Sequence, residues 1–160
     1  MRRIVAVESQ PLPGAADDDT VRLDHDQRTR RRMVFRTEGG AAILLDMPRP
    51  VRLHDGDALR LDDGGRVRVE AIAEALIEIA APSTAALVRI AWHLGNRHLP
   101  TQLLDGGDGG RLRIRHDHVI AQMVEGLGGA CQPVLAPFEP EGGAYAGSGD
   151  EHRPHGHGHG

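Results

Sequence analysis

The sequence has few of the residues that many small proteins use for cross-links or for aromatic surfaces. Its 160 residues include one Cys, one Trp, one Tyr, two Phe and no Lys, so all 19 basic residues are Arg. A single Cys excludes an intrachain disulfide and a Cys-based zinc or iron–sulfur cluster within one chain, and it suits a reducing cytosol. The scarcity of aromatic rings argues against a binder of single-stranded nucleic acid, which stacks bases on such rings.

Charge and hydropathy exclude two further classes. The formal net charge is -4 with neutral His, which argues against a general nucleic-acid binder, because binding to the phosphate backbone needs a basic surface. The N-terminus has no apolar core of a signal peptide, and no apolar run approaches the roughly 20 residues of a membrane span. We therefore expect a cytoplasmic protein with no nucleic-acid or membrane partner.

Residues 1–74 are predicted to form a small all-β domain. Short alternating runs are separated by turn residues every eight to twelve positions, which is typical of β structure and requires no helix in this part. The Asp-Asp-Gly-Gly turn at 62–65 marks the clearest hairpin. The predicted strands cover 3–7, 20–24, 32–37, 41–46, 57–61 and 66–71.

Residues 75–146 show a different pattern. Two apolar stripes at helical spacing predict two helices, one from about residue 83 to a left-handed turn at Gly95 and one from an N-cap at Asp117 to Gly128. Predicted strands at 76–80, 101–104, 111–114 and 131–135 give the order β-α-β-β-α-β. This order is the ferredoxin-like arrangement, in which two helices cover one face of an antiparallel sheet. The expected fold class is α+β.

Residues 147–160 are predicted to form a disordered tail, because Gly, Pro, Glu and His dominate them. Neutral imidazole is the commonest metal ligand in proteins, and intervening glycines let several imidazoles fold around one ion. An expression tag would be an unbroken His run, so we favour native metal capture. The tail histidines are His152, His155, His157 and His159.

The other six of the ten histidines differ in their setting. His98 follows a predicted helix end and is expected on the exposed rim before Pro100, although spacing alone indicates only a helix end with a histidine. His116 and His118 flank Asp117 at the mouth of the second helix, where they are either metal ligands or solvated junction residues.

The remaining candidates have structural interpretations. We expect His93 to be a structural residue of the last helical turn, and His25 and His54 to lie on the surface. Cys131 is interpreted as a small buried residue rather than a ligand. The basic run 28–32 is interpreted as a solvated edge strand.

Four further motifs stand in the second half of the chain: His-Leu-Gly-Asn-Arg-His at 93–98, Pro-x-Gln at 100–102, Arg-His-Asp-His-Val at 115–119 and Pro-Phe-Glu-Pro-Glu-x-Gly-Ala-Tyr at 137–145. Together they resemble the urease accessory protein E family of nickel metallochaperones. A Leu-x-x-x-Gln-Arg segment at 23–28 extends the resemblance over essentially the whole chain. The family implies an N-terminal domain of peptide-binding type and a C-terminal ferredoxin-like domain that binds metal and forms a homodimer.

The resemblance also implies roles for the histidines. His98 would be the principal ligand, placed near a two-fold axis so that both subunits contribute to one ion. His116 and His118 would bind peripherally, and the tail would chelate. Two departures, Arg115 where some members have His and only four tail histidines, suggest fewer ions per dimer.

The leading hypothesis is a non-enzymatic carrier that delivers Ni(II) to apo-urease. No Walker motif occurs, so nucleotide hydrolysis would belong to a partner, in the family an accessory GTPase. Imidazole sites also suit Zn(II) and Cu(II), so nickel is inferred from the family. Two alternatives remain at this point, a store or buffer for nickel or zinc, and a small zinc-dependent hydrolase built on His116, Asp117 and His118.

Overall fold

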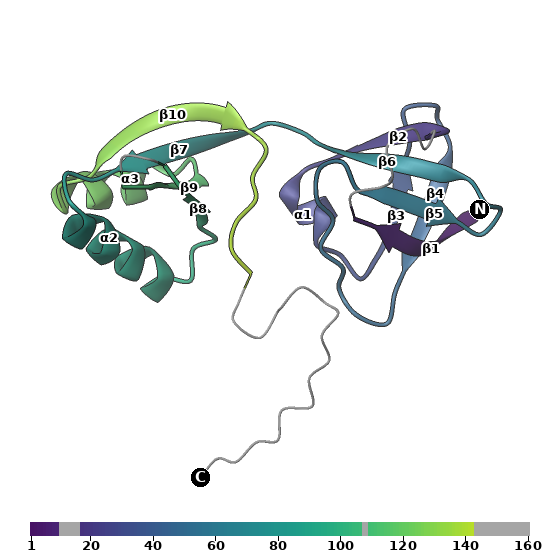
Figure 1. Cartoon of the computed structure of the whole chain (residues 1–160), viewed down its shortest axis with the longest axis horizontal. Coiled ribbons are helices and arrows are strands. Elements are labelled where there is room, and N and C mark those ends of the chain that lie inside the picture. The colour runs from purple at the N-terminus through teal and green to yellow at the C-terminus, as the bar shows by residue number, and fades with distance from the viewer. Residues whose placement is uncertain (10–16, 107–108, 143–160) are drawn as a thin grey trace, which may run out of the picture.

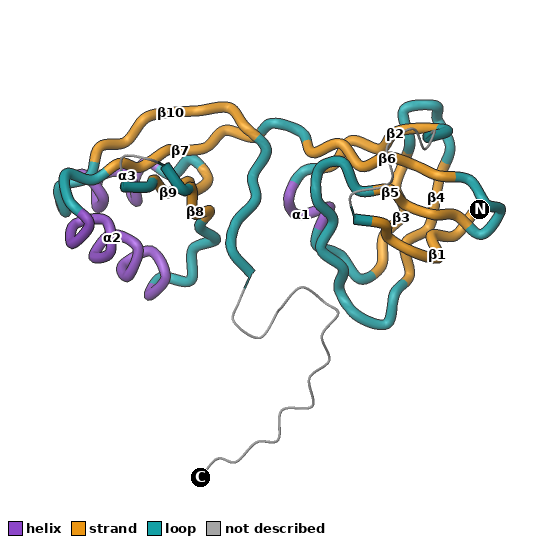
Figure 2. The backbone as a smooth tube through the Cα atoms, in the orientation of Figure 1, coloured by secondary structure: helices purple, strands orange, loops and turns teal. Residues whose placement is uncertain are grey.

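A computed structural model describes residues 1–9, 17–106 and 109–142 (Figures 1 and 2). It has two sheets with separate apolar cores, and strands outnumber helices, so the α+β expectation is confirmed. The predicted tail lies outside the described residues. In chain order the elements are β1 (Arg2–Glu8), β2 (Asp19–Leu23), α1 (His25–Arg28), β3 (Arg32–Arg36), β4 (Ala42–Asp46), β5 (Ala58–Leu61), β6 (Arg66–Ala71), β7 (Glu74–Ala80), α2 (Thr84–Asn96), β8 (Gln102–Leu104), β9 (Arg111–Arg115), α3 (His118–Gly126) and β10 (Ala130–Ala136).

The first sheet, with α1, forms the N-terminal lobe. Its strand order is β2-β6-β5-β1-β4-β3, with β1–β4 and β2–β6 parallel and the other pairs antiparallel. Strand β6 shows why alternating apolar residues predict these strands. Val67 and Val69 are buried, whereas Arg68 and Glu70 are exposed, as expected when successive side chains point to opposite faces of a sheet. All six strands predicted here are present.

The expectation that this part needs no helix is wrong. Helix α1 is a single turn closed by a reciprocal capping box, in which the Asp24 carboxylate accepts from the Gln27 backbone N–H at 2.8 Å. The Gln27 side chain in turn accepts from the Asp24 backbone N–H at 2.9 Å. The Asp-x-x-Gln spacing at 24–27 is that of a capping box and indicates a helix start. A helix of four residues is, however, too short to show an apolar stripe at helical spacing.

The second sheet, with α2 and α3, forms the C-terminal lobe. Its order is β10-β7-β9-β8 and all its pairs are antiparallel. Both helices cover one face, as Figure 1 shows, and bury Ile90, Leu94 and Val124 against Ile77 and Ile79. The predicted β-α-β-β-α-β order is confirmed.

The sheet topology places several loops at the end of the C-terminal sheet that faces the N-terminal lobe. Strand β7 begins there, opposite the last residue of β10, since Glu74 pairs with Ala136. The loop from α2 to β8 and the junction from β9 to α3 lie at the same end. The segment after β10 then passes between the lobes (Figure 1), where Phe138 is fully buried. Within the described residues, neither main helix is long and apolar enough to cross a membrane.

Candidate metal-binding site

His98 lies at a sharply defined helix end. Two backbone bonds close α2, from the His98 N–H to the Gly95 carbonyl at 2.9 Å and from the Leu99 N–H to the Leu94 carbonyl at 3.1 Å. This pair of bonds is a Schellman motif, in which the residue just after the cap is left-handed. His98 has a φ of 57°, the one positive φ of a non-glycine residue in the described part of the chain.

Helix α3 ends in the same motif but with glycine at the left-handed position. Gly128 donates to the Glu125 carbonyl and Gly129 donates to the Val124 carbonyl, at 3.0 and 2.9 Å, and Gly128 has a φ of 91°. The chain therefore uses glycine at one helix end and histidine at the other. The prediction that Gly95 forms the left-handed turn is wrong, because the helix continues through Asn96 and His98 takes that conformation.

The His98 side chain is exposed, as predicted, and lines a cavity between the lobes. The cavity has a volume of about 660 Å³. Leu99 and Pro100 are among the residues that line it beside His98, Val51 and Arg52 line it from the N-terminal lobe, and residues 140–142 line it as well. An exposed imidazole at the mouth of a cavity can be reached by a metal ion and by further ligands.

His116 and His118 lie at the junction of β9 with α3, and both are exposed. The Asp117 carboxylate between them is the N-cap of α3 and accepts from the Val119 and Ile120 N–H groups at 2.9 and 3.1 Å, as predicted. The topology brings this junction to the same end of the sheet as His98, yet neither histidine lines the His98 cavity. The four tail histidines lie outside the described residues.

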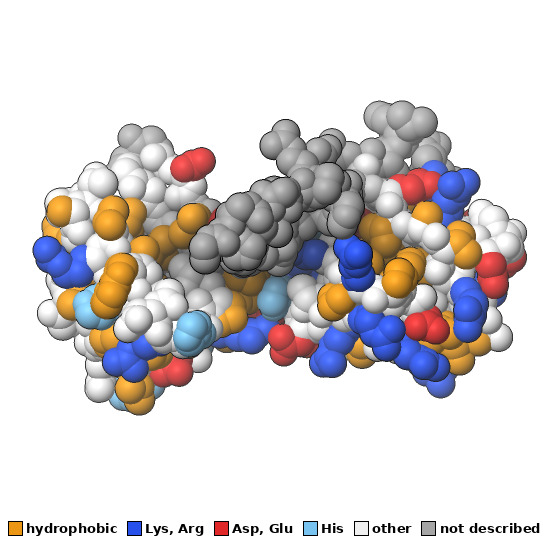
Figure 3. Space-filling model, turned by 90° about the horizontal axis from the view of Figure 1, so that it is seen from below, with side chains coloured by type: hydrophobic (Ala, Val, Ile, Leu, Met, Phe, Trp, Pro, Cys, Tyr) orange, Lys and Arg blue, Asp and Glu red, His pale blue; other side chains and the backbone are white. Residues whose placement is uncertain are grey.

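The zinc-hydrolase hypothesis gains no support from this geometry. One oxygen of Asp117 is already committed to two backbone donors, and no group of three His, Cys, Asp or Glu side chains is placed to hold a metal ion in residues 1–9, 17–106 and 109–142. Figure 3 shows imidazoles at separate points of the surface rather than in one cluster. The described residues of one chain therefore hold no preformed site of three such ligands.

His25 lies between the lobes instead of on the surface, contrary to expectation. Its side chain is 15% exposed, its ring meets the Phe138 ring edge-on at 5.5 Å, and Nδ1 lies 3.2 Å from the Arg115 guanidinium. Burial, then the charges of Arg115 and Arg28, lower the pKa of His25. Protonation of this imidazole is therefore less favourable between the two lobes than in water.

Arg28 also departs from the expected solvated run. Only 1% of its side chain is exposed, and its guanidinium faces the segment that follows β10. Local sequence does not indicate that Arg28 is buried, because its partners are 110 and 111 positions away in the chain. The later part of the run behaves as predicted, since β3 is an edge strand that begins at an exposed Arg32.

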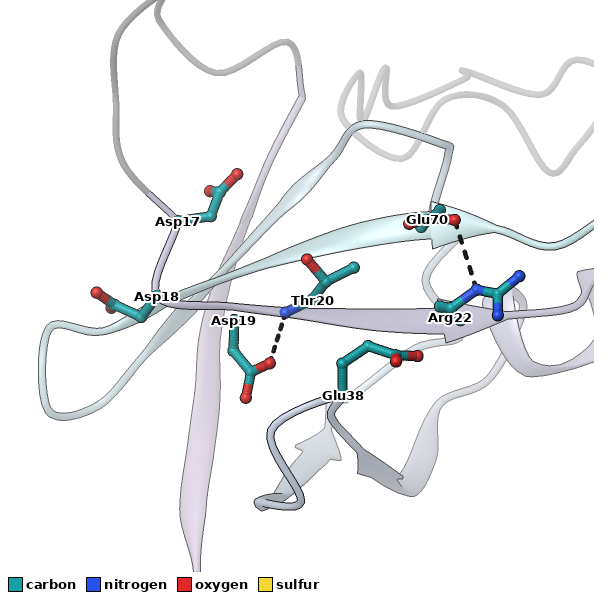
Figure 4. Close-up of a pocket in the computed structure, with 7 residues that line it drawn as sticks. All are labelled: Asp17, Asp18, Asp19, Thr20, Arg22, Glu38 and Glu70. Carbon is teal, nitrogen blue, oxygen red and sulfur yellow. Dashed lines mark hydrogen bonds and ion pairs between the residues drawn. The ribbon is translucent and has the colours of Figure 1, made fainter.

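A second cavity, of about 510 Å³, is acidic (Figure 4). Its carboxylates diverge from one another instead of pointing at a common centre. Asp19 accepts from the Thr20 and Gly39 N–H groups at 2.8 and 3.0 Å, and Glu70 pairs with Arg22 at 3.4 Å. Hydrogen bonds, first from the Thr37 side chain, lower the pKa of Asp19. Asp19 therefore holds the turn at Gly39, and Glu70 and Arg22 pair across the neighbouring strands β6 and β2.

Comparison with known proteins adds independent support for the family. Residues 2–72 match the model of the UreE urease accessory protein N-terminal domain, and residues 74–160 match the model of its C-terminal domain. A urease accessory protein UreE of Rhodopseudomonas palustris is 53% identical over 146 residues, which are 91% of this chain and 67% of that protein.

Two further relatives carry the same name. One from Beijerinckia indica is 49% identical over 137 residues, covering 86% of this chain and 77% of its own length. One from Chelativorans is 46% identical over 143 residues, covering 88% of each protein. The resemblance inferred from the motifs is thus confirmed, and the chain belongs to the UreE family of urease accessory proteins.

Proposed function

We propose that the protein is a nickel metallochaperone that delivers Ni(II) to apo-urease during assembly of the urease metallocentre. The observation that carries the proposal is His98, an exposed imidazole at a left-handed position where α3 has glycine. A non-glycine residue is strained there, and such strain concentrates at functional sites. An exposed ligand also suits a carrier, which must release its cargo.

A single His98 cannot hold a metal ion tightly, so the proposal includes a homodimer in which two copies of His98 share one ion. The exposed face of α2 supports this arrangement. Val88 and Trp92 lie one turn apart on that helix and are 61% and 62% exposed, and exposed apolar side chains that share a helix face can mark an interaction surface. Pairing of this face about a two-fold axis would cover both side chains and bring equivalent residues together.

The remaining ligands and partners complete the proposal. His116 and His118 bind further ions at the mouth of α3, and His152, His155, His157 and His159 capture Ni(II) and pass it to His98. Zn(II) and Cu(II) compete for the same imidazoles. Delivery takes place in the cytoplasm through the urease apoprotein and its accessory proteins, including the accessory GTPase, and the chain itself is not an enzyme.

Replacement of His98 by Asn tests the metal site without disturbing the helix end, because Asn tolerates the left-handed conformation and lacks an imidazole. We expect His98→Asn to abolish the tightest nickel site in calorimetry while the dimer persists in sedimentation. His93→Asn is the matched control within α2 and should retain that site. Unchanged tight binding in His98→Asn would overturn the assignment.

A transfer assay separates delivery from storage. Nickel-loaded protein is mixed with apo-urease and the accessory proteins, and urease activity is measured with a free nickel chelator present. Activation that requires the loaded protein supports delivery. A protein that retains its nickel under these conditions, or loses it only to the chelator, would instead be a store or buffer.

A further inference from the structure

One outer face of the N-terminal lobe combines arginines with exposed apolar side chains. It is formed by β1, β4 and β3, which are neighbours in the first sheet (Figure 1). Successive residues of a strand point to opposite sides of the sheet, so every second side chain of these strands points away from the apolar core. We call this surface the arginine face. Its residues are Arg3, Val5, Arg32, Val34, Arg36 and Leu44.

The register of the strands places these side chains in one continuous surface. Val34 is paired with Leu44, and Leu44 is paired on its other side with Arg3, so one row of side chains crosses all three strands. Arg32 and Arg36 stand two positions before and after Val34 on β3, and both are exposed. Four residues of a strand span roughly 13 Å. The two arginines therefore lie on either side of an apolar centre.

The apolar part of the arginine face is open to solvent. Val5 is 57% exposed and Val34 is 45% exposed. Among the described residues of the N-terminal lobe, the only other large apolar side chain that is exposed is Met1, which precedes β1. Charged residues on an edge strand deter pairing with other strands, but that role requires no exposed valines between them. Arginine together with exposed apolar side chains is typical of a protein–protein interface.

The arginine face is positive, although the chain as a whole has a net charge of -4. Arg3 lies 4.0 Å from the Asp46 carboxylate, at the limit of an ion pair. Arg32 and Arg36 contact no carboxylate within residues 1–9, 17–106 and 109–142. A partner that covers this face therefore meets two guanidinium groups whose charge the described part of the chain does not neutralise.

Two further arginines extend the positive charge beyond the start of β3. The Met47 N–H donates to the Arg31 carbonyl at 2.9 Å, which brings the loop after β4 against Arg31. Arg49 lies in that loop, and both Arg31 and Arg49 are exposed. The Arg31 guanidinium donates to a backbone carbonyl, that of Met47, at 3.3 Å, so its charge is not neutralised there. The excess of positive charge is thus a property of this whole side of the lobe.

We propose that the arginine face docks a protein partner whose surface carries carboxylates around an apolar patch, and that this partner is the complex that receives the nickel. Guanidinium groups bind carboxylates through two parallel hydrogen bonds, and the apolar patch covers the valines. A duplex nucleic acid offers phosphates but no apolar patch of this kind. The proposal rests on the proposed function, since it takes delivery to apo-urease as given, and it places no metal ligand on this face.

Charge reversal tests the docking. Full-length wild type, Arg32→Glu and Arg36→Glu are compared by surface plasmon resonance on an immobilised complex of apo-urease with its accessory proteins. We expect each variant to associate roughly tenfold more slowly than the wild type and with a weaker dependence on salt, because charges at an interface steer association. Arg68→Glu is the matched control and should bind as the wild type does. Arg68 is an exposed arginine of β6 in the same lobe, outside the arginine face, and its reversal changes the net charge by the same amount.

A substitution at Val34 tests the apolar part of the arginine face. Val34→Ser leaves the charge unchanged, and we expect the bound protein to dissociate about three- to tenfold faster, since losses of interface contact act mainly on the dissociation rate. Nickel affinity of all four variants, measured by calorimetry with Ni(II) alone, should equal that of the wild type, because the face contains none of the candidate ligands. Circular dichroism verifies that each protein is folded.

The outcomes are distinct. Arginine-face variants that bind the complex as the wild type does, or an equal loss in Arg68→Glu, would overturn the docking role while leaving delivery intact. Binding of duplex DNA or RNA that Arg36→Glu abolishes, with the complex still bound normally, would assign the face to nucleic acid instead. Self-association that Arg36→Glu removes in sedimentation would assign it to a second copy of the chain. Failure of the proposed function itself shows differently, because the nickel-loaded wild type then activates no apo-urease.

Discussion

At the scale of the residue, His98 shows a conflict between stability and ligation. An L-residue in the left-handed conformation is disfavoured by roughly 1–2 kcal/mol, and glycine avoids this strain at the equivalent position of α3, Gly128. Glycine has its own entropic disadvantage of about 0.5–1 kcal/mol relative to Ala in regular structure, which reduces but does not remove the difference. The helix end would therefore be more stable without the imidazole.

We expect His98→Gly to raise the free energy of unfolding by about 0.5–1 kcal/mol, because glycine relieves the left-handed strain while the two bonds of the Schellman motif persist. Urea unfolding of the metal-free protein measures the change. Gly128→Ala is the converse control and should lose about 1 kcal/mol. A His98→Gly protein less stable than the wild type would show that the imidazole contributes to packing.

At the scale of the element, α3 depends on its N-cap. Asp117 satisfies two backbone donors that the first turn of the helix would leave without partners, and its negative charge lies at the positive end of the helix. Asp117→Ala should lower the free energy of unfolding by about 1 kcal/mol, within the 0.5–2 kcal/mol range of such caps. Asp117→Asn, which retains a capping oxygen, should lose less.

Denaturant unfolding of the metal-free protein measures both Asp117 variants. Ser83→Ala is a comparison at the other helix, since the Ser83 hydroxyl accepts from the Ala86 N–H at 3.1 Å. Equal stability of Asp117→Ala and the wild type would contradict the capping role. It would then leave Asp117 available as a ligand between His116 and His118.

The elements also show which features a sequence can predict. Strand β6 and helix α2 follow from the period of their apolar residues, because each buries one face against a core that its own pattern implies. Helix α1 has no such face, and its only signal is a four-residue cap. The left-handed residue after α2 was assigned to Gly95 because glycine is the usual choice there, whereas the bonds place His98 in that conformation.

The candidate site divides in the same way. The exposed position of His98 after α2 and the Asp117 cap were predictable because local spacing defines them. Arg28 was not predictable, because a buried guanidinium looks like part of a basic surface run until its distant partners are known. The contact of Phe138 with His25 and Arg115 joins residues from three parts of the chain, and no periodicity relates them.

At the scale of the whole molecule, the boundary between the lobes contains an imidazole that resists protonation. Burial and the neighbouring guanidinium charges lower the pKa of His25 in the folded protein, whereas the unfolded chain takes up a proton near pH 6.5. Below about pH 6.5 the unfolded state therefore binds more protons at this position than the folded state does. Stability must rise with pH across this range, and it must fall on acidification.

We expect the free energy of unfolding of the wild type to fall more steeply between about pH 7.5 and pH 5.5 than that of His25→Asn, which has no proton to bind at this position. Urea unfolding of both metal-free proteins at the two pH values measures the difference. The loss of the ring contact with Phe138 lowers the stability of His25→Asn at both pH values, so only the change between them is compared. The other nine histidines are common to both proteins and cancel in that comparison. Equal changes in the free energy of unfolding of the two proteins would show that His25 titrates alike in the folded and unfolded chains. That result would require the lobes to open around His25 on acidification.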